Sequence, residues 1–233
     1  MEKIGCLCLR GFTRSPFEVE PLVEYLRLQT DWTFSVPVLT GHGENDDLSK
    51  VSYRDWIEHA ESALKELMFK CNEVYVIGFS MGGIIACYLA ANYPVKKLVL
   101  LSAAVKYINP KQLLLDIKSL IKDLIKGNVT NNELYLRYKN KIIKTPIRAT
   151  QQFRALVSAN STSYEEIKIP VFIAQGNKDG IVPVNSAYLL YEMIPASSKN
   201  LYIEEEAEHL ICHCQNNQKL FKEIELFLKK SVS

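Results

Sequence analysis

The stretch Val-Tyr-Val-Ile-Gly-Phe-Ser-Met-Gly-Gly, residues 74–83, joins an apolar run to a glycine-rich turn around one serine. The run from Val74 to Phe79 predicts a buried strand, and Ile84 to Tyr93 predicts a helix. Ser80 lies between them, with Gly78 two positions before it and Gly82 two positions after it. Small residues at these positions let the strand and the helix approach closely, so the pattern predicts a nucleophilic serine on a sharp, strained turn.

Similar apolar, β-rich runs recur along the chain and alternate with segments of helical period. This alternation predicts βαβ units and an α/β fold with a mostly parallel, doubly wound sheet. We expect about six or seven strands, which is consistent with the six runs that can be read. The runs are Ile4 to Leu9, Thr33 to Leu39, Val74 to Phe79, Lys97 to Ser102, Pro170 to Gln175 and Lys199 to Glu204.

Length and composition narrow the class of protein. The 233 residues suffice for one α/β domain with an insertion, and a hydrophobic fraction of 48% argues against disorder. A net charge of +2 gives no reason to expect a nucleic-acid partner.

The sequence runs from Met1 directly into the strand at Ile4 and has no apolar run long enough to span a membrane, so we expect a cytoplasmic protein. We also expect no metal site, because Cys212-His213-Cys214 has no second ligand pair at zinc spacing.

The alternation of strands and helices stops between residues 104 and 160, where helical segments follow one another. We therefore predict an α/β core at 1–103 and 161–233, with a helical cap inserted at 104–160. The cap contains eleven Lys or Arg residues against three Asp or Glu residues. This charge suggests either weak association with anionic lipid surfaces or simply a solvated helix face.

A serine hydroxyl needs a general base, and after a turn of this type the expected chain order is serine, acid, histidine. Of the two histidines downstream of Ser80, His209 follows a strand by a short loop, and we expect it to open the last helix. Asp179 lies in a loop directly after the run ending at Gln175. The rival acid position, after the run Lys97 to Ser102, offers no carboxylate. We therefore predict that Asp179 orients His209.

Two backbone N–H groups are candidates for stabilising an oxyanion. The Met81 N–H begins the helix that follows Ser80, where the helix dipole favours negative charge. The second donor should come from the loop after the first strand, where Gly11 precedes our candidate, the Phe12 N–H.

Together with Gly41-His42-Gly43 and His209-Leu210-Ile211, these motifs resemble the bacterial carboxylesterase and monoacylglycerol lipase group of the α/β-hydrolases. The resemblance covers nearly the whole chain and is weakest in the cap. It implies a catalytic triad of Ser80, Asp179 and His209, an acyl-enzyme intermediate, and no metal or organic cofactor. One departure is clear: relatives of this group usually have His-Gly where this chain has Arg10-Gly11.

The expected activity is therefore hydrolysis of short- to medium-chain acyl esters or monoacylglycerols by a monomer or homodimer. A thioesterase, a carbon–carbon bond hydrolase, a perhydrolase or a ligand-binding member without catalysis remain alternatives on the same fold. The acyl pocket should be lined from the cap, with these residues as candidates: Leu113, Ile117, Phe153 and Leu156.

Overall fold

The computed structural model describes residues 3–12, 16–43, 46–104 and 146–231. Six strands form one sheet in the order β2-β1-β3-β4-β5-β6, and all five pairings are parallel. The strands are β1 (Ile4–Leu9), β2 (Thr33–Ser35), β3 (Glu73–Phe79), β4 (Lys97–Leu101), β5 (Val171–Gly176) and β6 (Lys199–Glu204). The predicted α/β fold with a parallel sheet is confirmed, and β2 ends at Ser35, earlier than expected.

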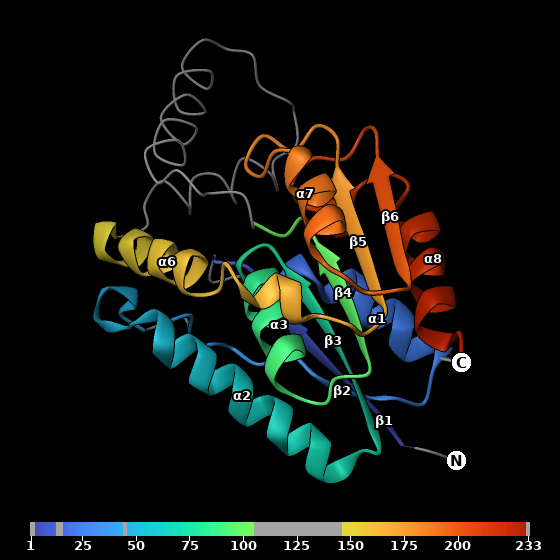
Figure 1. Cartoon of the computed structure of the whole chain (residues 1–233), viewed down its shortest axis with the longest axis horizontal. Coiled ribbons are helices and arrows are strands. Elements are labelled where there is room, and N and C mark those ends of the chain that lie inside the picture. The colour runs from blue at the N-terminus through green and yellow to red at the C-terminus, as the bar shows by residue number, and fades with distance from the viewer. Residues whose placement is uncertain (1–2, 13–15, 44–45, 105–145, 232–233) are drawn as a thin grey trace.

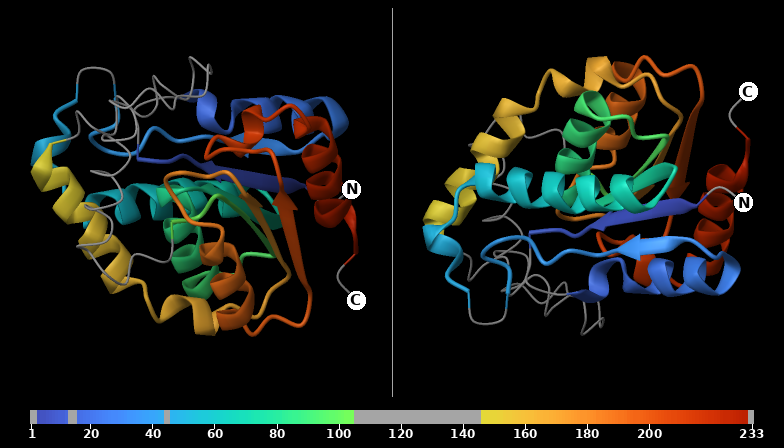
Figure 2. Two further views of the ribbon diagram at one scale, coloured as in Figure 1. Left: turned by 90° about the horizontal axis from the view of Figure 1, so that it is seen from above. Right: turned by 90° about the horizontal axis from the view of Figure 1, so that it is seen from below.

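Helices cover both faces of this sheet (Figures 1 and 2). Helices α1 (Glu20–Gln29) and α8 (Asn217–Lys229) pack on one face. The other face is covered by α2 (Tyr53–Lys70), α3 (Met81–Asn92) and α7 (Asn185–Met193), and α6 (Ile147–Ala159) packs against α2 and α3. Short 3-10 helices lie at Pro16–Glu18, Leu48–Lys50, Ser163–Glu166 and Ile211–His213.

Alternation along the strands builds two separate cores. In β5, Val171 and Ile173 face the α2–α3–α7 side, while Phe172 and Ala174 face the α1–α8 side. Successive side chains of a strand point to opposite faces, so a strand buried on both sides is apolar throughout. This explains why the runs that form the inner strands β1, β3, β4 and β5 are mostly apolar, whereas the edge strands β2 and β6 are less buried and carry more polar residues.

The register of the strands brings several loops to one edge. Gly78 of β3 pairs with Leu9 of β1 and with Leu100 of β4. Gly176 of β5 pairs with Glu204 of β6. The residues just after these positions therefore meet at the carboxyl ends of parallel strands, where open α/β sheets place their sites. In Figure 1 this edge lies toward the arrowheads of β4, β5 and β6.

Candidate active site

Ser80 connects β3 to α3 in a strained conformation. Its φ is 53° and its ψ is −115°, a combination that a residue with a side chain rarely adopts. The Ser80 N–H donates to the carbonyl oxygen of Leu101 at 2.9 Å, which ties the turn to the end of β4. A Cβ at Gly78 would lie 2.4 Å from the Gly82 carbonyl oxygen, so the turn closes only with glycine there. Ser80 is 7% exposed, so it is buried rather than on the open surface.

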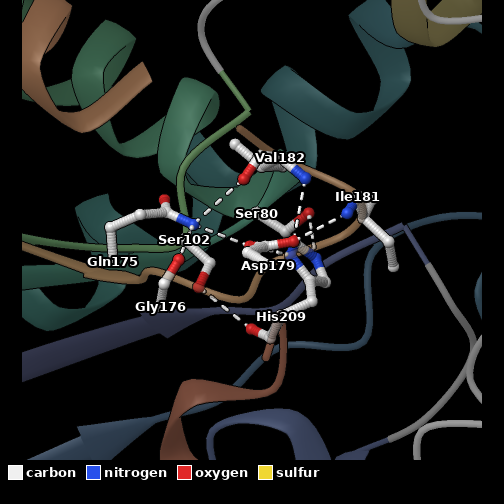
Figure 3. A network of polar contacts seen from close by, with 8 residues as sticks. All are labelled: Ser80, Ser102, Gln175, Gly176, Asp179, Ile181, Val182 and His209. Carbon is white, nitrogen blue, oxygen red and sulfur yellow. Dashed lines mark hydrogen bonds and ion pairs between the residues drawn. The ribbon is translucent and has the colours of Figure 1, made fainter. Parts of the chain in front are cut away.

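His209 reaches Ser80 from the loop after β6. Its Nε2 lies 3.1 Å from Ser80 Oγ, and its side chain is fully buried. The Phe79 ring packs against the imidazole with ring centroids 5.0 Å apart. The Ser102 hydroxyl donates to the His209 carbonyl oxygen at 2.9 Å, which fixes the backbone that carries the imidazole. Figure 3 shows Ser80, Ser102 and His209 close together, each from a different segment of the chain.

Asp179 completes a continuous line of polar contacts. Its Oδ2 lies 2.7 Å from His209 Nδ1, and its Oδ1 accepts the N–H groups of Ile181 and Val182 at 2.8 Å each (Figure 3). Since a carboxylate accepts hydrogen bonds, the Asp179 contact places the proton of a neutral imidazole on Nδ1. Nε2 is then free of a proton and can accept the Ser80 hydroxyl hydrogen.

Close packing between two loops allows His209 to reach this position. A Cβ at Gly176 would lie 2.3 Å from the Ala207 carbonyl oxygen and 2.7 Å from that of Glu208. The expectation that His209 opens the last helix is wrong, because α8 begins only at Asn217. His209 instead precedes a 3-10 turn at Ile211–His213, in which the Ile211 N–H donates back to the His209 carbonyl oxygen at 2.9 Å. The apolar residues after His209 are buried without forming a regular helix.

The loop after β1 lies against the start of α3. A Cβ at Gly82 would lie 2.5 Å from the carbonyl oxygens of Leu9 and Arg10, which shows how closely the two segments approach. The Gly11 N–H donates to Glu18 Oε2 at 2.7 Å and is therefore already occupied. The next described amide of the loop is that of Phe12, which is the predicted second donor. Met81 is the first residue of α3, where backbone N–H groups have no partner within the helix.

Arg10 is buried and not directed to solvent, with 5% of its surface exposed. Its guanidinium donates to the Pro37 carbonyl oxygen at 3.4 Å. Burial lowers the pKa of Arg10, and the negative charge of Glu18, a fully buried carboxylate, opposes that shift. Arg10 and Glu18 thus balance each other's charge beside the loop. Nothing in the sequence around Glu18 indicated this role, because its partner Gly11 is seven residues away.

Two of the four predicted pocket residues can be located. Phe153 of α6 packs against Phe12 with ring centroids 5.4 Å apart, and is thus near the loop after β1. Leu156 is fully buried in the core cluster on the α3 side of the sheet. Leu113 and Ile117 lie outside the described residues, as does most of the predicted cap.

The other three histidines have contacts that do not involve Ser80. His42 is buried beside Phe12 and Trp56, and its Nδ1 lies 3.2 Å from the Thr40 carbonyl oxygen. His59 Nδ1 lies 3.2 Å from Thr40 Oγ1. His213 Nε2 lies 2.7 Å from the Phe17 carbonyl oxygen. In the part of the chain that the structure describes, no group of three His, Cys, Asp or Glu side chains could hold a metal ion.

A parallel sheet with a serine on a strained strand-to-helix turn, and with an Asp and a His following later strands, defines the α/β-hydrolase fold. The chain belongs to the family described as serine aminopeptidase, S33, whose model matches residues 39–214. The chain is also 27% identical over 207 residues to a thermostable monoacylglycerol lipase from a Bacillus species, covering 85% of this chain and 79% of the relative. A carboxylesterase from Bacillus subtilis is 23% identical, covering 96% of this chain and 92% of the relative.

Solved structures agree on the fold. A structure reported with two metagenome-derived lipolytic enzymes, LipS and LipT, superimposes with a TM-score of 0.81 and 21% identity, covering 99% of this chain and 95% of that chain. A lipase-esterase related protein from Clostridium acetobutylicum gives a TM-score of 0.73 and 21% identity, covering 96% of this chain and 94% of that chain.

No helix among the described residues is long and apolar enough to cross a bilayer.

Proposed function

We propose that this chain hydrolyses carboxylic esters, with Ser80 as nucleophile, His209 as general base and Asp179 as the carboxylate that orients His209. The observation that carries the proposal is the unbroken line of contacts from Ser80 Oγ to His209 Nε2 at 3.1 Å and from His209 Nδ1 to Asp179 at 2.7 Å. An activated serine of this kind attacks carbonyl carbon. The relatives named monoacylglycerol lipase and carboxylesterase support esters as the substrate class.

In the first half of the reaction, Ser80 Oγ bonds to the ester carbonyl carbon while His209 Nε2 takes the hydroxyl proton. The carbonyl oxygen becomes an oxyanion, which the N–H groups of Met81 and Phe12 stabilise. The bond to the alcohol oxygen then breaks, and His209 returns its proton to that oxygen. The alcohol leaves, and the acyl group remains on Ser80.

In the second half, water replaces the alcohol. His209 takes a proton from the water as the water oxygen attacks the acyl carbon, and the same two N–H groups stabilise the second oxyanion. Ser80 leaves with the proton from His209, and the carboxylic acid is released. Throughout the cycle, the Asp179 carboxylate stabilises the imidazolium form of His209.

Short- to medium-chain acyl esters or monoacylglycerols are the substrates we propose. Phe153 supports an apolar acyl site, because it lies against Phe12, whose N–H is the proposed oxyanion donor. Leu156 continues the same apolar side of α6 one turn later. We keep residues 104–160 as the proposed cap, with 1–103 and 161–233 as the core. The chain acts as a monomer or a homodimer in this proposal.

The cap's positive charge supports weak association with anionic lipid surfaces. Vesicles that contain phosphatidylglycerol should bind the protein at low salt, and vesicles of phosphatidylcholine alone should not. Equal binding to both would contradict an electrostatic contribution. A cytoplasmic site of action is supported by the six cysteines, which are all free thiols in the structure, as is typical of a reducing compartment.

The central test compares the wild type with Ser80→Ala on p-nitrophenyl esters of increasing acyl length. We expect Ser80→Ala to lose at least about 10³-fold in kcat, because the nucleophile is removed while folding is preserved. A fluorophosphonate probe should label the wild type and not the variant. Undiminished turnover by Ser80→Ala would show that another group performs the chemistry. The acyl length that gives the highest kcat/KM shows how long an acyl chain the pocket accommodates best.

A further inference from the structure

The end of β5 carries a polar side chain in an apolar setting. Gln175 is 1% exposed, and the strand residues before it, from Val171 to Ala174, are all buried and apolar. A buried amide is costly unless its hydrogen bonds are made. Gln175 makes them within the loop that follows its own strand, as Figure 3 shows. Its Nε2 donates to Asp179 Oδ2 at 2.7 Å and to the Val182 carbonyl oxygen at 3.2 Å.

The orientation of the Gln175 amide follows from its neighbours. A carboxylate and a backbone carbonyl are both acceptors, so only the NH₂ end of the amide can face them. The two hydrogens of Nε2 then serve these two nearer acceptors, and the Gly176 carbonyl oxygen, at 3.5 Å, is a third and longer contact. An uncharged amide provides these two donors without bringing a positive charge beside His209. A lysine at this position would instead pair directly with Asp179 and compete with the imidazole for its charge.

The four donors around Asp179 divide between its two oxygens. Backbone N–H groups of Ile181 and Val182 hold Oδ1. Oδ2 is shared by His209 Nδ1 and Gln175 Nε2, each 2.7 Å away. The oxygen that contacts the imidazole is thus positioned by one side chain from outside the line of Ser80, His209 and Asp179.

We infer that Gln175 is a positioning residue, which holds Asp179 Oδ2 against His209 Nδ1 and thereby holds His209 Nε2 on Ser80 Oγ. This inference rests on the proposed function, in which these three residues form the catalytic triad. Gln175 touches neither the substrate nor the reacting atoms. Its effect passes through Asp179, and it therefore changes the chemical step and leaves ester binding unaltered.

Gln175→Met tests the inference, because methionine fills a similar volume and provides no N–H donor. We expect kcat to fall by about tenfold, which corresponds to one hydrogen bond to a charged group, with KM unchanged. A residue that only fills space would leave kcat at the wild-type value. Ser186→Ala is the matched control: it removes another fully buried polar side chain, in α7, and should leave kcat unchanged.

A double-mutant cycle shows whether the effect passes through Asp179. In the Asp179→Asn background, Gln175→Met should change kcat by less than about twofold, because coupled residues are not additive. An undiminished tenfold effect in that background would overturn the inference.

One measurement uses the wild type alone, so it can be made even if Gln175→Met does not fold. In proton NMR of the wild type, the Gln175 side-chain NH₂ should give a nuclear Overhauser effect to the downfield Nδ1–H of His209, because both donate to the same oxygen. Absence of this effect in a spectrum that resolves both resonances would overturn the inference. The proposed function is judged separately, by Ser80→Ala and the fluorophosphonate probe.

Discussion

Two buried carboxylates, at opposite ends of the sheet, are held by different kinds of donor. Asp179, beyond the carboxyl end of β5, is held by two backbone N–H groups, the Gln175 amide and His209. Glu225, 3% exposed on α8, accepts hydrogen bonds from Tyr25 at 2.8 Å, Lys229 at 2.7 Å and Lys222 at 3.0 Å. The hydrogen bond from Lys229 is the largest of the effects that lower the pKa of Glu225, to about 2.

The difference teaches what a buried carboxylate is used for. Glu225 contacts two lysines of its own helix and a tyrosine of α1, so it joins two helices and its charge is paired with two cations. Asp179 is held by the neutral donors Ile181 N–H, Val182 N–H and Gln175 Nε2, and its Oδ2 lies 2.7 Å from His209 Nδ1. Charge that is neutralised by a cation stabilises packing, whereas charge that is oriented by neutral donors is available for chemistry.

Asp179→Asn should produce the largest effect. The asparagine NH₂ group cannot accept the Nδ1–H of His209, so the imidazole is driven to the tautomer with its proton on Nε2, which cannot take a proton from Ser80. We expect kcat to fall by about 10⁴-fold with little change in thermal stability. Steady-state kinetics and a melting curve on one preparation measure both. A loss smaller than tenfold would remove Asp179 from the mechanism.

Gly176→Ala should affect activity and stability together. The added Cβ would meet the Ala207 carbonyl oxygen at 2.3 Å and displace the loop that carries His209. We expect a loss of about 1–3 kcal/mol in the free energy of unfolding, as is usual for overpacking, and a kcat lowered at least tenfold.

Gly5→Ala is the matched control for that substitution. A Cβ at Gly5, at the start of β1 and far from Ser80, would meet Cys71 Sγ at 3.1 Å. Stability should fall modestly and kcat should not change. If Gly5→Ala lowered kcat as much as Gly176→Ala, the lower kcat of Gly176→Ala would result from general destabilisation of the fold and not from displacement of His209.

Glu225→Gln should produce the smallest effect on activity and a clear effect on stability. Glutamine keeps the shape and loses the charge that attracts Lys222 and Lys229, so the unfolding midpoint at pH 7 should fall while kcat stays unchanged. Because the pKa of folded Glu225, about 2, lies below the ordinary value of 4.5, its stabilisation is complete above about pH 4.5 and disappears as the pH falls toward 2.

The difference in melting temperature between wild type and Glu225→Gln should therefore shrink over that interval. Melting curves at several pH values measure it directly. A constant difference from pH 7 to pH 2 would mean that the two lysines contribute nothing through charge.

The sequence predicted the fold well because burial on both faces leaves a continuous apolar run, as in β3 and β5. The sequence also indicated that Ser80, Asp179 and His209 lie close together, because their order along the chain follows from the topology of the sheet. The contributions of Glu18 and Gln175 were not foreseen, since each depends on a hydrogen bond made by the folded loop and not on a periodic pattern. The start of the last helix was misplaced because buried residues after His209 form a 3-10 turn first.

The distance along the chain between Ser80 and His209 has a consequence for synthesis. The two residues are 129 positions apart, and a ribosome adds about 5–20 residues per second, so on the order of ten seconds separates them. During that interval the serine is an ordinary hydroxyl, because no base stands beside it. In the proposed mechanism, Ser80 becomes reactive only when β6 has joined the edge of the sheet and brought His209 into place. Under the proposed function, the growing chain therefore cannot attack an ester through Ser80 until His209 has been made and folded into place.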